Sequence, residues 1–300
     1  MALVTWTTGS GNPATQIRRL IRAAIGLHST FKDEVWLWRG EANSAHRLEP
    51  GMHTRLRRST KVPHDEAAIR TATDWLIGAA RRHGLDRAED VALPDLALLA
   101  SLQHHGAATP LLDVTVDPLV ALWMVANSSG DNVNGEDDVP GRLIAIRRPP
   151  PRRWIDAFDA RPYIGRSSSI SSLLGADGIH WYRPPEISER LRIQRGSFVL
   201  GAFDTAGDDT SLHLKAHPEP GEEGWLDDRI TNLGKAGKPV RAATDVVVLD
   251  VKPSLKAELR DWLTDRAGLS RSVIFPTPWH RPNLEAFART YGRGRSLDDD

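Results

Sequence analysis

Strand-like and helix-like segments are interspersed along this chain, without the regular alternation that builds a doubly wound parallel sheet. Short apolar segments indicate strands at 35–38, 111–115, 143–146, 193–203 and 246–251. No Pro-, Gly- or Ser-rich linker separates two self-sufficient cores. The sequence therefore predicts one α+β domain.

Helical periodicity is clearest between His64 and Arg82, where apolar residues recur every three or four positions between Pro63 and Gly84. Further helices are expected at 13–24, at about 94–104, after Asp117-Pro118 and at 254–266. Residues 207–237 are expected to form a long insertion loop, and the Gly-, Arg- and Asp-rich tail 292–300 is expected to be disordered.

Composition excludes several classes of protein. The chain has 39 Lys and Arg against 39 Asp and Glu, so it lacks the overall basic excess of a protein that wraps nucleic acid. It has no cysteine, which excludes disulfides, thiolate metal sites and a cysteine nucleophile. Its longest apolar run, Leu119 to Ala126, is too short to span a bilayer, and the start lacks a secretory signal. A cytoplasmic location is expected.

Four segments resemble the FRG-domain family of bacterial proteins, named for a Phe/Tyr-Arg-Gly motif that stands here as Trp38-Arg39-Gly40. The second segment, Gln103 to Thr115, is similar to the family's Gln-His-Tyr-Gly-x-x-Thr-Arg-Leu-Leu-Asp-Trp-Thr block. The third, at 182–198, and the fourth, Ile274-Phe275-Pro276, follow in the family's order. The resemblance implies a single FRG domain over 1–291, with an N-terminal helical segment at 13–30.

The chain departs from the family block at two positions. Pro110 stands where the family has Arg, and Val114 stands where it has Trp. Any role that those two family side chains play is therefore not carried over to this sequence.

The first two segments also resemble, more distantly, the ADP-ribosyltransferases. That resemblance implies a central, split antiparallel or mixed sheet flanked by helices, with NAD as the co-substrate. It implies transfer of ADP-ribose to a macromolecular acceptor, protein or RNA, by a bacterial toxin or antiphage defence effector. An antitoxin or regulatory protein is a further expected partner.

The resemblance assigns roles to particular residues. Arg39 would bind the NAD phosphates or ribose, because guanidinium offers a planar fork of donors, and Gly40 would leave room for the ligand. Thr115 would orient Arg39 or a ribose hydroxyl, and Gln194 would hold the ribose where transferases carry their catalytic glutamate. The remaining residues expected at the NAD site are Trp38, Gln103, His104 and Asp113.

Several alternatives stay open at the residue level. An amide at Gln194 cannot act as a base, so Glu186 or Glu189 could supply the carboxylate instead. His104 could contact ribose, act as an acid or base, or bridge backbone groups. Asp113 could anchor a loop or pair with Arg39 or Arg190. Adjacent His104 and His105 make a poor metal pair, and no metal site is expected.

Two other functions remain compatible with the sequence. One is a non-catalytic nucleotide-binding or interaction module that kept the pocket and lost the carboxylate. The other is an RNA-cleaving toxin that uses His104 beside a basic rim, for which Arg147, Arg148, Arg152 and Arg153 are candidates. Tyr163 and Trp181 could stack on a base or lie in the core.

Overall fold

The computed structural model describes residues 5–6, 11–29, 36–88, 90–127, 136–165, 167–175, 178–185, 188–204, 210–214, 245–276 and 282–299. The chain forms two compact units, each assembled from three segments. Unit 1 comprises Met1–Arg47, Val114–Arg148 and Leu214–Pro276, and unit 2 comprises Leu48–Asp113, Pro149–His213 and Thr277–Asp300. The expected insertion 207–237 lies outside the described residues except for 210–214.

A mixed sheet forms the centre of unit 1. Its strands run in the order β1 (Thr5–Trp6), β10 (Val246–Val251), β6 (Gly141–Arg147), β2 (Trp36–Glu41) and β5 (Leu112–Thr115), of which β5 begins in unit 2 and ends in unit 1. β1 pairs parallel with β10, and the other pairs are antiparallel. β-branched residues dominate β10, which suits a pleated, buried surface.

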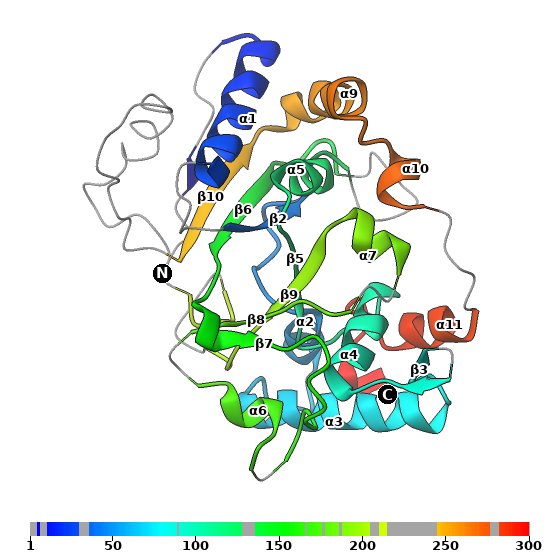
Figure 1. Ribbon diagram of the computed structural model, residues 1–300. Helices are drawn as coiled ribbons and strands as arrows, with labels where there is room; N and C mark the ends of the chain where they lie inside the picture. The colour runs from blue at the N-terminus through cyan, green and yellow to red at the C-terminus, as the bar shows by residue number, and fades with distance from the viewer. Residues whose placement is uncertain are drawn as a thin grey trace. The chain divides into compact units, whose positions relative to one another are not determined.

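Helices cover one face of this sheet (Figure 1). α1 (Pro13–Ser29), α5 (Pro118–Ala126) and α9 (Lys256–Ala267) pack with one another, and α5 also packs on β2 and β6. Alternate strand residues point into this layer, namely Trp36, Trp38, Leu143, Ala145, Val247, Leu249 and Val251. The intervening residues, among them Leu37, Ile144 and Val248, are buried on the opposite face.

Local chemistry sets where α5 begins. The Asp117 side chain accepts a hydrogen bond from the Leu119 N–H at 2.9 Å, and Pro118 occupies the first turn. The helix is apolar all round, as expected for one packed between a sheet and two other helices. η2 (Pro253–Leu255) leads into α9, and α10 (Arg271–Ile274) follows it.

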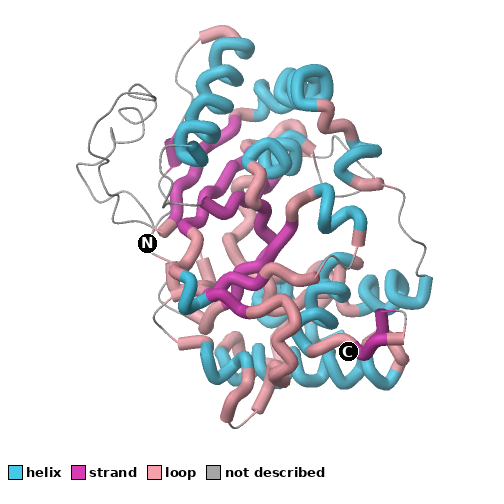
Figure 2. Tube along the Cα trace, in the orientation of Figure 1, coloured by secondary structure: helices cyan, strands magenta, loops and turns pink. Residues whose placement is uncertain are grey.

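Unit 2 is mainly helical, and its strands are short (Figure 2). β7 (Trp154–Ile155) pairs parallel with β8 (His180–Tyr182), and β8 pairs antiparallel with β9 (Gly196–Leu200). β3 (Arg87–Ala88) and β4 (Val91–Ala92) form a separate antiparallel pair. The helical elements are α2 (Gly51–Arg58), α3 (Glu66–Arg82), α4 (Asp95–His104), η1 (Pro151–Arg153), α6 (Ile170–Leu173), α7 (Glu189–Ile193), α11 (Pro282–Thr290) and η3 (Leu297–Asp299).

The architecture confirms an α+β fold with a mixed sheet flanked by helices. The prediction of a single domain over 1–291 stays a prediction. Within the described part of the chain, no helix combines the length and the apolar character needed to cross a bilayer.

The prediction that the C-terminal tail is disordered is corrected by its hydrogen bonds. Residues 293–299 pack on unit 2, where Asp298 accepts hydrogen bonds from the Thr60 N–H and hydroxyl at 2.8 Å each and from the Ser59 hydroxyl. Arg55 donates to the Ser296 carbonyl at 3.1 Å. The polar composition of the tail reflects these capping contacts, because Asp298 closes the loop that follows α2.

Candidate functional site

The Trp38-Arg39-Gly40 motif lies inside β2, which continues to Glu41, and not at the strand end that the sequence predicted. Successive side chains on a strand point to opposite faces, so Trp38 and Gly40 face α5 while Arg39 faces away from it. Trp38 is completely buried in the helical layer, and its Nε1–H has no hydrogen-bond partner among the described residues.

Gly40 allows α5 to approach the sheet closely. A Cβ built at Gly40 would overlap the carbonyl oxygen of Ala121 and would lie 2.9 Å from the Val125 nitrogen. Both of those atoms belong to the α5 backbone, which cannot rotate away as a side chain could. The glycine is therefore required by helix–strand packing, whatever ligand the motif binds.

Arg39 belongs to a buried chain of charges that the sequence analysis missed. Its Nε donates to Glu41 Oε1 at 2.9 Å, and the other carboxylate oxygen, Oε2, accepts from Arg142 Nε at 2.7 Å. Arg142 also donates through Nη2 to the carbonyl of His46. Strand alternation placed residues 39 and 41 on one face, so Glu41 could have been found; Arg142 required the β2–β6 register, which pairs it with Glu41.

Thr115 lies beside the motif. It is the register partner of Trp38 across the antiparallel β2–β5 pair. Its hydroxyl oxygen accepts from the Asp117 N–H at 3.0 Å, which fixes the turn that leads into α5. β5 and β2 are thus neighbouring strands, and the hydroxyl has a local backbone partner.

Gln103 and Asp113 clamp the connection between α4 and β5. The buried Thr109 hydroxyl donates to Gln103 Oε1 at 2.9 Å, and Gln103 Nε2 donates to Asp113 Oδ2 at 2.6 Å. The Leu111 N–H donates to the Thr109 hydroxyl at 3.2 Å. Both ends of the amide are therefore used to hold this loop, which gives the Gln103 to Asp113 part of the family block a structural role.

His104 contacts the start of α7. Its Nε2 lies 3.1 Å from the Ser188 hydroxyl oxygen, which also accepts from the Leu191 N–H as the N-cap of α7. Which of the two groups donates in the Ser188–His104 bond depends on the tautomer of the ring. Burial, together with the nearby Arg190 and His105, lowers the pKa of His104 to about 3.

Gln194 is the C-cap of α7 and not a strand residue, so the predicted strand 193–203 is shortened to β9. The next residue, Arg195, adopts a left-handed backbone conformation with φ of 46°, which turns the chain into β9. Of the alternative carboxylates, Glu189 lies on the exposed side of α7, 3.5 Å from Arg192. Glu186 lies outside the described residues.

The candidate residues divide between the two units. Trp38, Arg39, Gly40 and Thr115 belong to unit 1, whereas Gln103, His104, Asp113 and Gln194 belong to unit 2. Burial lowers the pKa of the Arg190 guanidinium, and the nearby Asp113 carboxylate opposes part of this shift. No group of three or more metal-binding side chains is present within the described residues.

Part of the chain is similar to a known protein family. Residues 34–133 match the FRG domain. The FRG segment contains β2, the α2 to α4 helices, β5 and α5, and with them every candidate residue except Gln194. Glu41 also lies within it, whereas Arg142 lies just beyond. No curated protein and no solved structure matches the chain.

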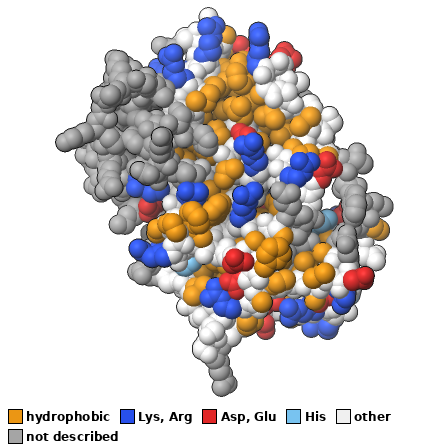
Figure 3. Space-filling view, viewed as in Figure 1, with side chains coloured by type: hydrophobic (Ala, Val, Ile, Leu, Met, Phe, Trp, Pro, Cys, Tyr) orange, Lys and Arg blue, Asp and Glu red, His pale blue; other side chains and the backbone are white. Residues whose placement is uncertain are grey.

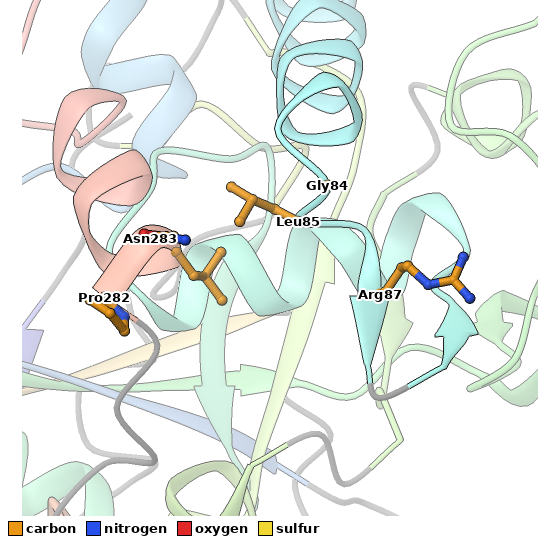
Figure 4. Close-up of a pocket in the computed structure, with 6 residues that line it drawn as sticks. Gly84, Leu85, Arg87, Pro282 and Asn283 are labelled. Atoms are coloured by element: carbon orange, nitrogen blue, oxygen red, sulfur yellow. The ribbon is translucent and has the colours of Figure 1, made fainter.

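A pocket of about 210 Å³ lies in unit 2, where Gly84, Leu85 and Arg87 of the FRG segment meet residues 282–284 of α11. The Leu85 side chain extends toward α11, whereas the Arg87 side chain extends away from it (Figure 4). None of the candidate residues lines this pocket, and it is small for a ligand of nucleotide size.

Tyr163 and Trp181, outside the FRG segment, are buried in unit 2. The Tyr163 N–H donates to Asp95 Oδ2 at 2.7 Å, and Trp181 Nε1 donates to the Ser197 hydroxyl at 3.0 Å. Their core alternative is therefore the one that the structure supports. The face drawn in Figure 3 carries basic, acidic and hydrophobic side chains intermixed, in keeping with the balanced composition.

Proposed function

We propose that this protein is an ADP-ribosyltransferase-like enzyme that cleaves NAD and transfers ADP-ribose to a protein or RNA acceptor, as a bacterial toxin or antiphage defence effector. The observation that carries the proposal is the β2–β5 pair. It puts the strand of Arg39 beside the hydroxyl-bearing strand of Thr115, followed at once by a helix packed under β2. The resemblance to transferases rests on this same order of elements.

The proposed chemistry uses few groups. Arg39 binds the diphosphate of NAD, since a guanidinium supplies paired donors to phosphate oxygens. The bond between ribose C1′ and the nicotinamide nitrogen breaks, and nicotinamide leaves with the electron pair. A nucleophile on the acceptor then bonds to C1′ and loses its proton. Gln194 donates to or accepts from the ribose hydroxyls.

His104 has a limited part in this proposal. Because its pKa is lowered to about 3, the ring is neutral at pH 7 and cannot donate a proton as an imidazolium. Its hydrogen bond with Ser188 makes it a structural link between α4 and α7. The same neutrality weighs against an RNA-cleaving toxin that needs His104 as its acid.

Incubation with NAD labelled on the adenylate part tests the proposal. We expect nicotinamide release and label on a macromolecule from cell extract, with both lost in Arg39→Ala. Arg260→Ala is the matched control, because it removes another partly buried arginine of unit 1 that is ion-paired, to Asp137 at 2.7 Å. The proposal would be overturned if the wild type released no nicotinamide, or if Arg39→Ala and Arg260→Ala had the same activity.

A second candidate is a nucleotide-binding module without catalysis. It is favoured by two observations: Gln194 carries no charge, and Glu189 is paired with Arg192 on the exposed side of α7. Such a module would bind NAD without releasing nicotinamide, and Gln194→Glu would leave that unchanged. An enzyme should change its rate of nicotinamide release in Gln194→Glu, because a carboxylate stabilises the oxocarbenium-like transition state.

A further inference from the structure

A chain of three charged side chains, Arg142, Glu41 and Arg39, connects the interior of unit 1 to the more exposed Arg39. The side chains of Glu41 and Arg142 are 4% and 8% exposed, and that of Arg39 is 14% exposed. Arg142 is fixed at its far end by the His46 carbonyl. The two deeper members are thus shielded from solvent, and the outermost member is the residue that the proposed function assigns to NAD.

Glu41 uses its two oxygens for different partners. Oε1 accepts from Arg39 Nε, while Oε2 accepts from Arg142 Nε. Nε is the guanidinium nitrogen that is bonded to the aliphatic part of the Arg39 side chain. A hydrogen bond from this nitrogen to Glu41 therefore fixes the rotation of the guanidinium group. Hydrogen bonds between charged groups are about twice as strong as neutral ones, and burial protects these from salt screening.

We propose that Glu41 is a positioning residue for Arg39. It holds the Arg39 guanidinium in one orientation for the diphosphate of NAD, and Arg142 in turn holds Glu41. The inference rests on the proposed function for its ligand, but the orientation of Arg39 is a property of the protein alone. Glu41 itself touches no reacting atom.

A purely structural ion pair predicts a different outcome. In that case, losing Glu41 lowers the stability of unit 1 and affects NAD binding only as much as stability falls. A positioning role predicts that Glu41 acts through Arg39. Its loss should then have little effect on NAD binding once Arg39 is already absent.

The first measurement needs no ligand. In protein labelled with ¹⁵N-arginine, the Arg39 Nε–H should give a resolved, slowly exchanging resonance in the wild type, assigned by its loss in Arg39→Lys. In Glu41→Gln we expect this resonance to move to the position of exposed arginines and to exchange faster. An unchanged resonance in a folded Glu41→Gln variant would overturn the positioning role, whatever the ligand.

The second measurement is a double-mutant cycle of NAD affinity with Arg39→Ala and Glu41→Gln. We expect Glu41→Gln alone to raise the NAD dissociation constant by about 10-fold, the size expected for a charge-assisted contact. In the Arg39→Ala background the same change should have an effect of less than about 2-fold. Equal effects in both backgrounds would show a structural role only.

Asp137→Asn serves as the control, since it breaks the Asp137–Arg260 ion pair of the same unit without touching Arg39. It should lower the melting temperature while leaving the Arg39 resonance and NAD affinity in place. If wild-type protein binds no NAD while the resonance still depends on Glu41, the proposed function fails and the positioning of Arg39 for another ligand stands.

Discussion

At the scale of single residues, the candidate motif combines two different physical demands on neighbouring positions of β2. Gly40 meets a packing demand, because the backbone of α5 occupies the space of a side chain. Arg39 meets an electrostatic demand on the opposite face, where Glu41 and Arg142 surround one carboxylate with two guanidinium groups. A substitution at Gly40 should therefore disturb helix packing, whereas a substitution at Arg39 should disturb the ion pairs of Glu41.

Gly40→Ala should lower the free energy of unfolding by about 3 kcal/mol or more, because the new methyl group overlaps backbone that cannot rotate away. Gly78→Ala is the control. Gly78 lies within α3, where a Cβ would meet only the flexible end of Arg82 at 3.2 Å, so alanine should stabilise by about 0.5–1 kcal/mol. Chemical denaturation measures both, and equal stability of the two variants would contradict the close approach of α5.

His104 should make stability depend on pH. Its pKa in the folded protein is about 3 against the ordinary 6.5, so the unfolded chain binds the proton more readily. Stability is therefore complete above pH 6.5 and falls as the pH is lowered toward 3, by roughly 2–3 kcal/mol between pH 7 and 4.

The variant His104→Gln should make that fall shallower, because the amide can still hydrogen-bond with Ser188 and takes up no proton. His83→Gln, which changes an exposed histidine at the end of α3, is the matched control. Urea denaturation at a series of pH values measures the difference, and parallel profiles for the wild type and His104→Gln would refute the assignment.

At the scale of elements, the Asp298 carboxylate accepts several of the hydrogen bonds that hold the C-terminal segment. Several donors from the loop after α2 hold the pKa of Asp298 well below its usual value, the Ser59 hydroxyl first among them. The contact should therefore persist as the pH falls through about 4, the ordinary aspartate range, and be lost only in stronger acid. The C-terminal segment thereby holds the loop that follows α2.

Asp298→Ala should speed hydrogen exchange of the Thr60 and Lys61 amides, which donate to this carboxylate at 2.8 and 3.4 Å. Asp265→Ala, in an exposed part of α9, should leave those amides protected. Exchange detected by mass spectrometry or NMR makes the comparison. Equal protection in both variants would mean that another contact holds the segment.

Sequence reasoning succeeded where the information is local. The periodicity of α3, the approximate bounds of α4, the Asp117 cap of α5 and the apolar run of β10 depend on residues that are close in sequence. It failed where partners are distant in the chain. Asp298 contacts Ser59 and Thr60, and Glu41 contacts Arg142, only in the folded chain. Gly40 was interpreted as the end of a strand, because the α5 backbone that requires a glycine there is distant in the sequence.

At the scale of the whole molecule, the FRG segment depends on elements outside it. All six residues of β2 pair with β6, and the outer surface of α5 packs against α1 and α9. None of β6, α1 or α9 lies within residues 34–133. The matched segment therefore contains most of the candidate residues without containing their structural support.

A fragment of residues 34–133 should consequently lack fixed tertiary structure, with poorly dispersed NMR signals and no cooperative thermal transition. The full chain, under the same conditions, should show both dispersed signals and a cooperative transition. A cooperatively folded fragment would mean that β2 and α5 find their structure without β6, α1 and α9.

The interleaving of the two units has a consequence for folding during translation. The chain passes between units at 47/48, 113/114, 148/149, 213/214 and 276/277, so each unit receives residues from the early, middle and late parts of translation. A nascent chain that has already exposed Arg39 still lacks β10 and α9 until residue 267 has left the ribosome. A chain interrupted before residue 267 therefore carries the residues of the motif without the complete scaffold that orients them.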